Sequence, residues 1–200
     1  MQIKPNKGLS DEVIEEIQDE YAIVFPEDYK VFLRKYNGGK PHLAECIEYG
    51  DFFTSIRNLF SFRTGEEYSS VEKFPLPFDY DLEFWVEHGM IPIGDNMWGD
   101  LFMMNVKNAP GKVYFSVHDE GFRLIRLANS FTEFIGLFKK RNLDPASWDE
   151  EARAQYEEWS RKMDEQEIAE YGQEEFERRR AEREAGKLKM NEGMIEVVLN

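Results

Sequence analysis

The spacing of apolar residues in the first part of the chain predicts two short amphipathic helices. The first would follow Ser10, a plausible cap, and its apolar positions are Val13, Ile14, Ile17 and Tyr21. The second would start at Pro26, whose fixed φ suits a first helical position. Its apolar positions are Tyr29, Phe32, Leu33 and Tyr36. Asn37-Gly38-Gly39 tolerates the left-handed conformation that ends helices, so the second helix should end there.

From residue 43 the pattern changes to one typical of strands. Phenylalanine, isoleucine and leucine recur through residues 43–62 and favour strands or buried loop. Residues 64–81 carry two prolines and are interpreted as a long connection, and residues 82–88 predict a short helix that ends at Gly89.

Short apolar segments separated by turn residues then predict an antiparallel meander. The expected strands are residues 91–93, 101–106, 112–118 and 122–127. Ser130 or Asn129 would cap a following helix that carries Phe131, Phe134, Ile135, Leu137 and Phe138. The predicted fold class is therefore α+β, a mainly antiparallel sheet packed against helices.

The composition shifts after Asp144-Pro145, where we divide the chain into a domain of residues 1–145 and an acidic helical extension of residues 146–200. The extension holds 16 acidic and 9 basic residues. Its apolar residues recur at helical spacing, at Trp148, Ala152, Tyr156, Trp159 and Met163. A more polar helix should follow Gly172, with ion pairs Glu174–Arg178 and Glu175–Arg179. Residues 194–199 (MIEVVL) predict a final edge strand.

The net charge of −15, from 40 acidic and 25 basic residues, changes the expected class of partner. Such a field repels nucleic acid and anionic lipid and speeds encounter with a basic protein. We therefore expect no direct binding to nucleic acid or membrane. Cys46 is the single cysteine, and the N-terminus lacks the apolar region of a signal peptide. Cytoplasmic location is the prediction, and the oligomeric state stays open.

The stretch IPIGDNMWGD (residues 91–100) is the best candidate for a ligand loop, but it fits no known type. Asp100 and Leu101 stand where a P-loop requires Lys and Ser/Thr, and no glutamate completes an EF-hand. It is interpreted as a turn in which Asp95 and Asn96 form side-chain turns. His42 with Cys46 lacks further metal ligands, and His118 precedes two acids at a strand end. We expect no catalytic residue, metal or cofactor.

Two stretches together resemble the signatures of the SUKH superfamily. FPEDYKVFLRKYNGGKP (residues 25–41) resembles its "LPxDYxxFLxxYNGG" helix. IPIGDNMWGDLFMMNV followed by GKVYFSVHDE resembles its second signature, and FTEFIGLF resembles its closing helix. The resemblance covers residues 8–140 in the expected order. The turn after "IGD" is enlarged by Met97 and Trp98, and the extension lies outside the resemblance.

The superfamily includes a fungal cell-wall-synthesis regulator and many bacterial immunity proteins of polymorphic toxin systems. The resemblance implies a non-catalytic immunity protein that neutralises a cognate toxin, such as a nuclease, in the cytoplasm. The alternative is a general protein-binding regulatory or scaffold module on the same fold, and an uncharacterised hydrolase ranks third. An anchor from Trp98 and charge complementarity would make the contact. The candidate residues are Asp95, Trp98, Asp100, Glu48, Asp51, Asp119 and Glu120.

Overall fold

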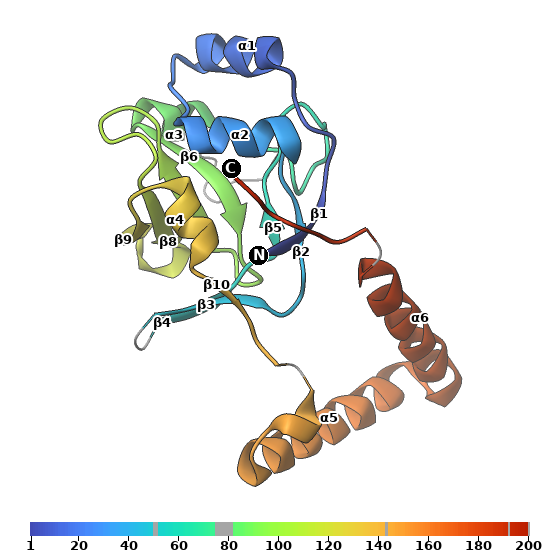
Figure 1. Ribbon diagram of the computed structural model, residues 1–200. Coiled ribbons are helices and arrows are strands. Elements are labelled where there is room, and N and C mark those ends of the chain that lie inside the picture. The colour runs from blue at the N-terminus through green and yellow to red at the C-terminus, as the bar shows by residue number, and fades with distance from the viewer. Residues whose placement is uncertain (50–51, 75–81, 143, 192, 200) are drawn as a thin grey trace. The chain divides into compact units, whose positions relative to one another are not determined.

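An antiparallel sheet organises the first of two units in the computed structural model, which describes residues 1–200 apart from 50–51, 75–81, 143, 192 and 200. Within the described residues this sheet has eight strands in the order β11-β1-β2-β5-β6-β7-β8-β9 (Figure 1). Their bounds are β1 Gln2–Pro5, β2 Gly39–Pro41, β5 Asn58–Leu59, β6 Met90–Asp95, β7 Leu101–Asn105, β8 Val113–Val117, β9 Arg123–Ala128 and β11 Ile195–Glu196. The predicted α+β class and the meander from β6 to β9 are confirmed.

A smaller sheet corrects the expected closing helix. It has the order β10-β3-β4, with β3 Glu45–Tyr49, β4 Phe52–Ser55 and β10 Phe138–Lys140. Phe138 was expected in a helix, but the helix ends at Gly136 and Phe138 pairs with Ile47 of β3. Ile47 lies far from Phe138 in the sequence, so the local helical pattern around Phe138 could not reveal that the two residues pair.

The helices of the first unit are α1 Asp11–Tyr21, α2 Glu27–Lys35, α3 Leu82–Glu87 and α4 Phe131–Gly136. The Ser10 hydroxyl accepts the Val13 N–H at 3.5 Å, and the Ser130 hydroxyl accepts the Glu133 N–H at 3.0 Å, which confirms both caps. Pro26 lies at the N-cap of α2, one residue before the predicted position.

Aromatic side chains fill the space between α2, α4 and the large sheet. The ring of Phe131 lies 4.8 Å from Tyr29 and 4.9 Å from Phe32, and the ring of Phe134 lies 5.4 Å from Phe102 on β7. All five side chains are buried. Burying each contributes about 1.5–3 kcal/mol, so this cluster holds α2 and α4 against the strands that carry the turn after β6.

The YNGG segment joins α2 to β2 through backbone that side chains would obstruct. Asn37 adopts φ 42°, and its amide donates to the Phe62 carbonyl at 2.8 Å while its oxygen accepts the Phe62 N–H at 2.9 Å. Gly39 adopts φ 140°, and a Cβ there would lie 2.5 Å from the Lys4 carbonyl oxygen. The expected left-handed ending is confirmed, and it also lets β2 pair closely with β1.

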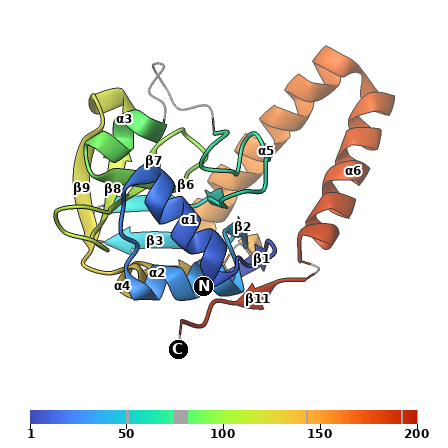
Figure 2. The ribbon, with the colours of Figure 1, turned by 90° about the horizontal axis from the view of Figure 1, so that it is seen from above.

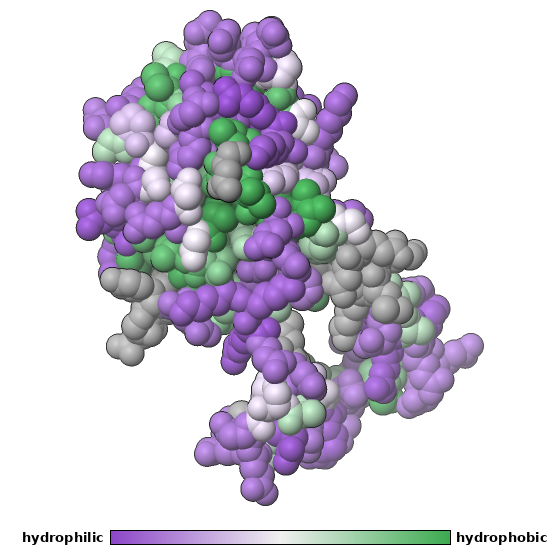
Figure 3. Space-filling model, in the orientation of Figure 1, coloured by the Kyte–Doolittle hydropathy of each residue, from purple (hydrophilic) through white to green (hydrophobic). Residues whose placement is uncertain are grey.

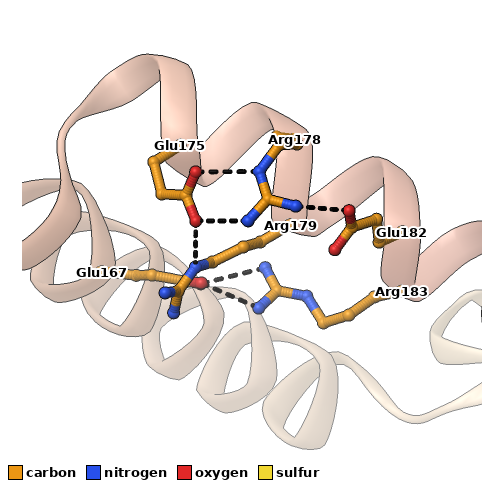
Figure 4. Close-up of polar contacts among 6 residues, drawn as sticks. All are labelled: Glu167, Glu175, Arg178, Arg179, Glu182 and Arg183. Atoms are coloured by element: carbon orange, nitrogen blue, oxygen red, sulfur yellow. Dashed lines mark hydrogen bonds and ion pairs between the residues drawn. The ribbon is translucent and has the colours of Figure 1, made fainter.

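The second unit comprises Arg141–Gly193 and contains a short 3-10 turn at Pro145–Ser147 followed by α5 Glu150–Tyr171 and α6 Gln173–Asn191. Gly172, at φ 86°, separates the two helices. Arg183 of α6 makes two hydrogen bonds with Glu167 of α5, both at 2.9 Å (Figure 4). The predicted Glu175–Arg179 pair is present at 2.9 Å, but Arg178 pairs with Glu175 and Glu182 in place of Glu174.

The chain then returns to the first unit, as the edge-strand prediction required. Strand β11 pairs antiparallel with β1, beside which it lies in Figure 2. The Tyr36 hydroxyl accepts the Val198 N–H at 3.0 Å, and it also lies 3.3 Å from the Val198 carbonyl oxygen. Met194–Asn200 therefore belongs with the first unit, whereas the sequence analysis grouped it with the extension. The helical unit is an insertion between β10 and β11.

Candidate functional site

The turn between β6 and β7 is held in shape by one asparagine. The Asn96 side-chain oxygen accepts the N–H groups of Trp98 and Asp100, each at 2.9 Å, and the Asn96 N–H donates to the Asp100 carbonyl at 3.0 Å. Gly99 adopts φ 94°. The predicted side-chain turn at Asn96 is confirmed, and its polar atoms are directed inward, because Asn96 is only 1% exposed.

Asp95, at the end of β6, links the start of this turn to β5. Its carboxylate is fully buried and accepts hydrogen bonds from Arg57 Nε at 2.8 Å and from Asn58 Nδ2 at 3.0 Å; Arg57 Nη2 contacts the same oxygen as Nε. Burial raises the pKa of Asp95, although the hydrogen bonds from Arg57 and Asn58 oppose that rise. The expected side-chain turn at Asp95 is therefore wrong, because its carboxylate accepts hydrogen bonds from Arg57 and from Asn58 of β5.

A histidine joins this turn to the next one along the sheet edge. His118 begins the 3-10 turn His118–Glu120 after β8, and its Nδ1 lies 2.8 Å from Asp100 Oδ1. Its Nε2 lies 2.9 Å from Asp119 Oδ1. The His118 N–H also donates to Asp100 at 3.0 Å. Three of the predicted contact residues, Trp98, Asp100 and Asp119, are thus gathered by two adjacent turns.

Large apolar side chains stand exposed on the same turn. Trp98 is 60% exposed and Met97 is 63% exposed. The turn is therefore an apolar tip beside carboxylates, and Asp119 is largely solvent-accessible. We call Met97, Trp98, Asp100, His118 and Asp119 the Trp98 surface. An exposed aromatic and a methionine with a polar border are typical of protein-binding sites.

One family model matches residues 8–137 of this chain, and it describes the SMI1/KNR4 family (SUKH-1). The chain belongs to this family. The match contains the YNGG segment, the Trp98 surface and α4, and it ends before the helical insertion. SUKH-1 membership is consistent with a function like that of immunity proteins, and the family is generally non-catalytic. No curated protein matches the chain.

Of the other predicted contact residues of this SUKH-1 domain, two lie in different settings of the described structure. Glu120 follows Asp119 in the same turn and pairs with Arg123 at 2.5 Å. Glu48 of β3 pairs with Phe53 of β4. The next residue of β4, Thr54, points to the opposite face of the small sheet, where its hydroxyl accepts the Asn96 amide at 3.2 Å. Asp51 lies outside the described residues.

Sequence reasoning missed two residues of this SUKH-1 site. Arg57 lies 38 positions from Asp95, and no local pattern connects them. Met97 was noted only as an enlargement of the turn, although its exposure makes it part of the apolar tip. Met97 and Trp98 lie in a turn, where apolar residues follow neither the helical nor the strand periodicity. The sequence therefore could not predict whether their side chains are buried or exposed.

The histidine and cysteine side chains near this turn are held in contacts with their neighbours. His118 Nδ1 contacts Asp100 and its Nε2 contacts Asp119. Among the described residues no group of three or more His, Cys, Asp and Glu side chains is placed to hold a metal ion. Cys46 is buried in β3, and its Sγ lies 3.5 Å from the Lys139 carbonyl. None of the described helices has the length and apolar character needed to span a membrane.

Replacing Asp100 by asparagine tests how the Trp98 surface is held. Burial alone would raise the pKa of Asp100, but hydrogen bonds from His118 and Asn96 outweigh it and lower the pKa below 3.8. Ionised Asp100 therefore stabilises the fold above that value, and this contribution disappears as the pH falls through the lowered pKa. We expect Asp100→Asn to lose about 1 kcal/mol at neutral pH.

Urea denaturation of both proteins at several pH values measures the effect. The stability difference between wild type and Asp100→Asn should shrink as the pH falls through the lowered pKa of Asp100, because the wild-type carboxylate then also loses its charge. A difference that stays constant across this range would show that the ionised carboxylate does not stabilise the turn.

Proposed function

We propose that this SUKH-1 protein neutralises a toxin by tight, non-covalent binding and performs no catalysis itself. The observation that carries the proposal is the Trp98 surface: an exposed tryptophan and methionine beside carboxylates, on a turn that hydrogen bonds to the buried Asn96 hold in shape. Interfaces concentrate their binding energy in such aromatic anchors. A rigid anchor also loses little conformational freedom on binding, which favours affinity.

The partner that fits this surface is a basic protein with an apolar pocket. Asp119 and Glu120 are exposed at the border, and the whole chain carries a net charge of −15. Opposite charges steer association and align the two surfaces before the tryptophan enters its pocket. A toxin that acts on nucleic acid presents a positive surface to phosphates, and carboxylates compete for that surface. A nuclease or another nucleic-acid-targeting toxin is therefore the favoured partner class, and the encounter would take place in the cytoplasm.

Co-expression with the product of the adjacent gene tests the function. We expect rescue of growth from a toxic neighbour and a stable complex of the two purified proteins. A non-toxic neighbour that nevertheless forms a complex would support the regulatory or scaffold alternative. Absence of both toxicity and binding would overturn the proposal.

The Trp98→Ala variant tests the site. Truncating a buried interface anchor costs about 2 kcal/mol, so the dissociation constant of the complex should rise about 30-fold. Tyr68→Ala is the matched control, because Tyr68 is also 60% exposed but lies on the loop after β5. Isothermal titration of both variants against the neutralised toxin measures the difference. Equal affinities for the two variants would exclude the Trp98 surface as the anchor.

A further inference from the structure

The helical insertion carries a groove of its own, separate from the Trp98 surface. One hollow of about 750 Å³ is lined by the start of the unit and the first turns of α5, and includes Trp148 and Tyr156. A second, shallow hollow of about 350 Å³ lies over one face of α5, from Tyr156 to Ile168. Because both hollows share Tyr156, we treat them as one groove, the α5 groove.

The wall of the α5 groove is aromatic. The rings of Trp148 and Tyr156 meet edge to face, with centroids 5.3 Å apart. The Trp148 indole N–H donates to the Asn142 carbonyl at 3.0 Å, which fixes the ring against the start of the unit. Tyr156 remains 39% exposed and Met163, about two turns further on, is 38% exposed. Large apolar side chains are thus accessible on this face of α5.

The charge of the groove is acidic. Helix α5 contains eight acidic and three basic residues, whereas α6 contains five acidic and six basic residues. Arg161, which lines the groove, is paired with Glu165 at 3.0 Å, and Glu157 and Asp164 line the groove beside them. Hydrophilic residues also dominate the visible surface of this unit in Figure 3. A ligand for this groove must therefore carry both positive charge and apolar groups.

Ion pairs join the two helices of this unit. Glu167 and Arg183 join α5 to α6, and Glu175 contacts both Arg178 and Arg179 (Figure 4). The Arg179 guanidinium also lies 3.8 Å from the Tyr171 ring centroid, across the corner at Gly172. Each exposed pair is weak alone, but a network limits the bending of the hairpin. The groove is presented on a preorganised element.

We propose that the α5 groove binds a basic amphipathic segment of a partner protein. Lysine or arginine side chains of that segment face Glu157 and Asp164, and its apolar side chains pack on Tyr156 and Ile168. The aromatic ring also attracts a cation placed over its face. This is recognition of one amphipathic segment by the exposed face of another helix, with complementary charge. It uses a different surface from the Trp98 contact and does not depend on the proposed toxin.

The test uses the full-length chain and a defined probe. The probe is a synthetic helical peptide of leucine and lysine, with leucines at i, i+3, i+4 and i+7 spacing, and its counterpart carries glutamate in place of lysine. We expect the lysine peptide to bind and the glutamate peptide not to bind. Glu157→Lys/Asp164→Lys should weaken binding at least about tenfold, which corresponds to the loss of two charge contacts. Tyr156→Ala should weaken it by a similar factor, and its exposed position leaves the fold intact.

Glu15→Lys/Glu16→Lys is the matched control, because it makes the same change in net charge at exposed positions of α1. It should weaken binding less than about threefold, since long-range attraction contributes little at moderate salt. An equal loss in the two double variants would overturn the proposal in favour of general electrostatic attraction. Sedimentation of wild type and Tyr156→Ala tests whether a second copy of the chain occupies the groove instead. A wild-type dimer that is lost in Tyr156→Ala would show this and overturn the proposal.

Discussion

Replacing Arg57 by alanine is expected to destabilise the SUKH-1 domain by about 3–5 kcal/mol at neutral pH. Arg57 is the cationic partner of Asp95, whose carboxylate is fully buried and also accepts a hydrogen bond from the Asn58 amide. Removing the guanidinium leaves a buried negative charge without compensation, which is more costly than removing the whole pair. Urea or thermal denaturation measures the loss.

A second substitution identifies the cause of that loss. Arg57→Ala/Asp95→Asn removes both charges and should recover much of the stability lost in Arg57→Ala, because asparagine can still accept from Asn58. Lowering the pH should also reduce the deficit of Arg57→Ala. Burial raises the pKa of Asp95, so its carboxyl takes up a proton in the fold before an exposed carboxyl would. A deficit that neither the second substitution nor acid reduces would mean that Arg57 acts through packing alone.

Replacing Gly39 by alanine should cost about 3 kcal/mol, the second large effect we expect. Gly39 combines φ 140°, which an L side chain rarely adopts, with a Cβ position 2.5 Å from the Lys4 carbonyl oxygen. That oxygen belongs to the backbone of β1, so the contact is relieved only by separating β1 from β2. The edge formed by β1 and β11 should loosen with it, and faster hydrogen exchange at Ile3 would report this.

Gly65→Ala is the control for this substitution. Gly65 also has a positive φ, 71°, but a Cβ there would meet no atom within 4 Å. It should cost about 1 kcal/mol, because only the backbone strain remains. If both variants lose the same stability, the close approach of β1 to Gly39 adds nothing to the cost of the backbone strain.

The insertion has a consequence for the SUKH-1 fold itself. Because β11 follows the helical unit and covers the edge of β1, the two ends of the chain lie in adjacent strands. The Val197 N–H donates to the Met1 carbonyl at 3.0 Å, and Val198 is bound by Tyr36 of the YNGG segment. The helical unit therefore leaves the domain at β10 and returns to it at β11, which anchors both of its ends.

Much of the fold was predictable because its signals are local. The caps at Ser10 and Ser130, the left-handed Asn37 and the short meander turns act over a few residues, and each was placed correctly. The same holds for the turn after β6, where Asn96 bonds the backbone two and four residues on. Phe138 failed this reasoning, because pairing with Ile47 decided its conformation from 91 positions away.

The sequence by itself determined the family, the α+β class and the position of the turn that carries Trp98, because these depend on motifs and backbone conformations of residues close together in the chain. Only the tertiary structure decided which turn residues face solvent: Trp98 and Met97 are exposed, while Asp95 is buried against Arg57. It also decided that His118 joins two turns and that β11 returns to pair with β1. These outcomes depend on contacts between distant segments, whose burial and pairing energies arise only when the chain has folded.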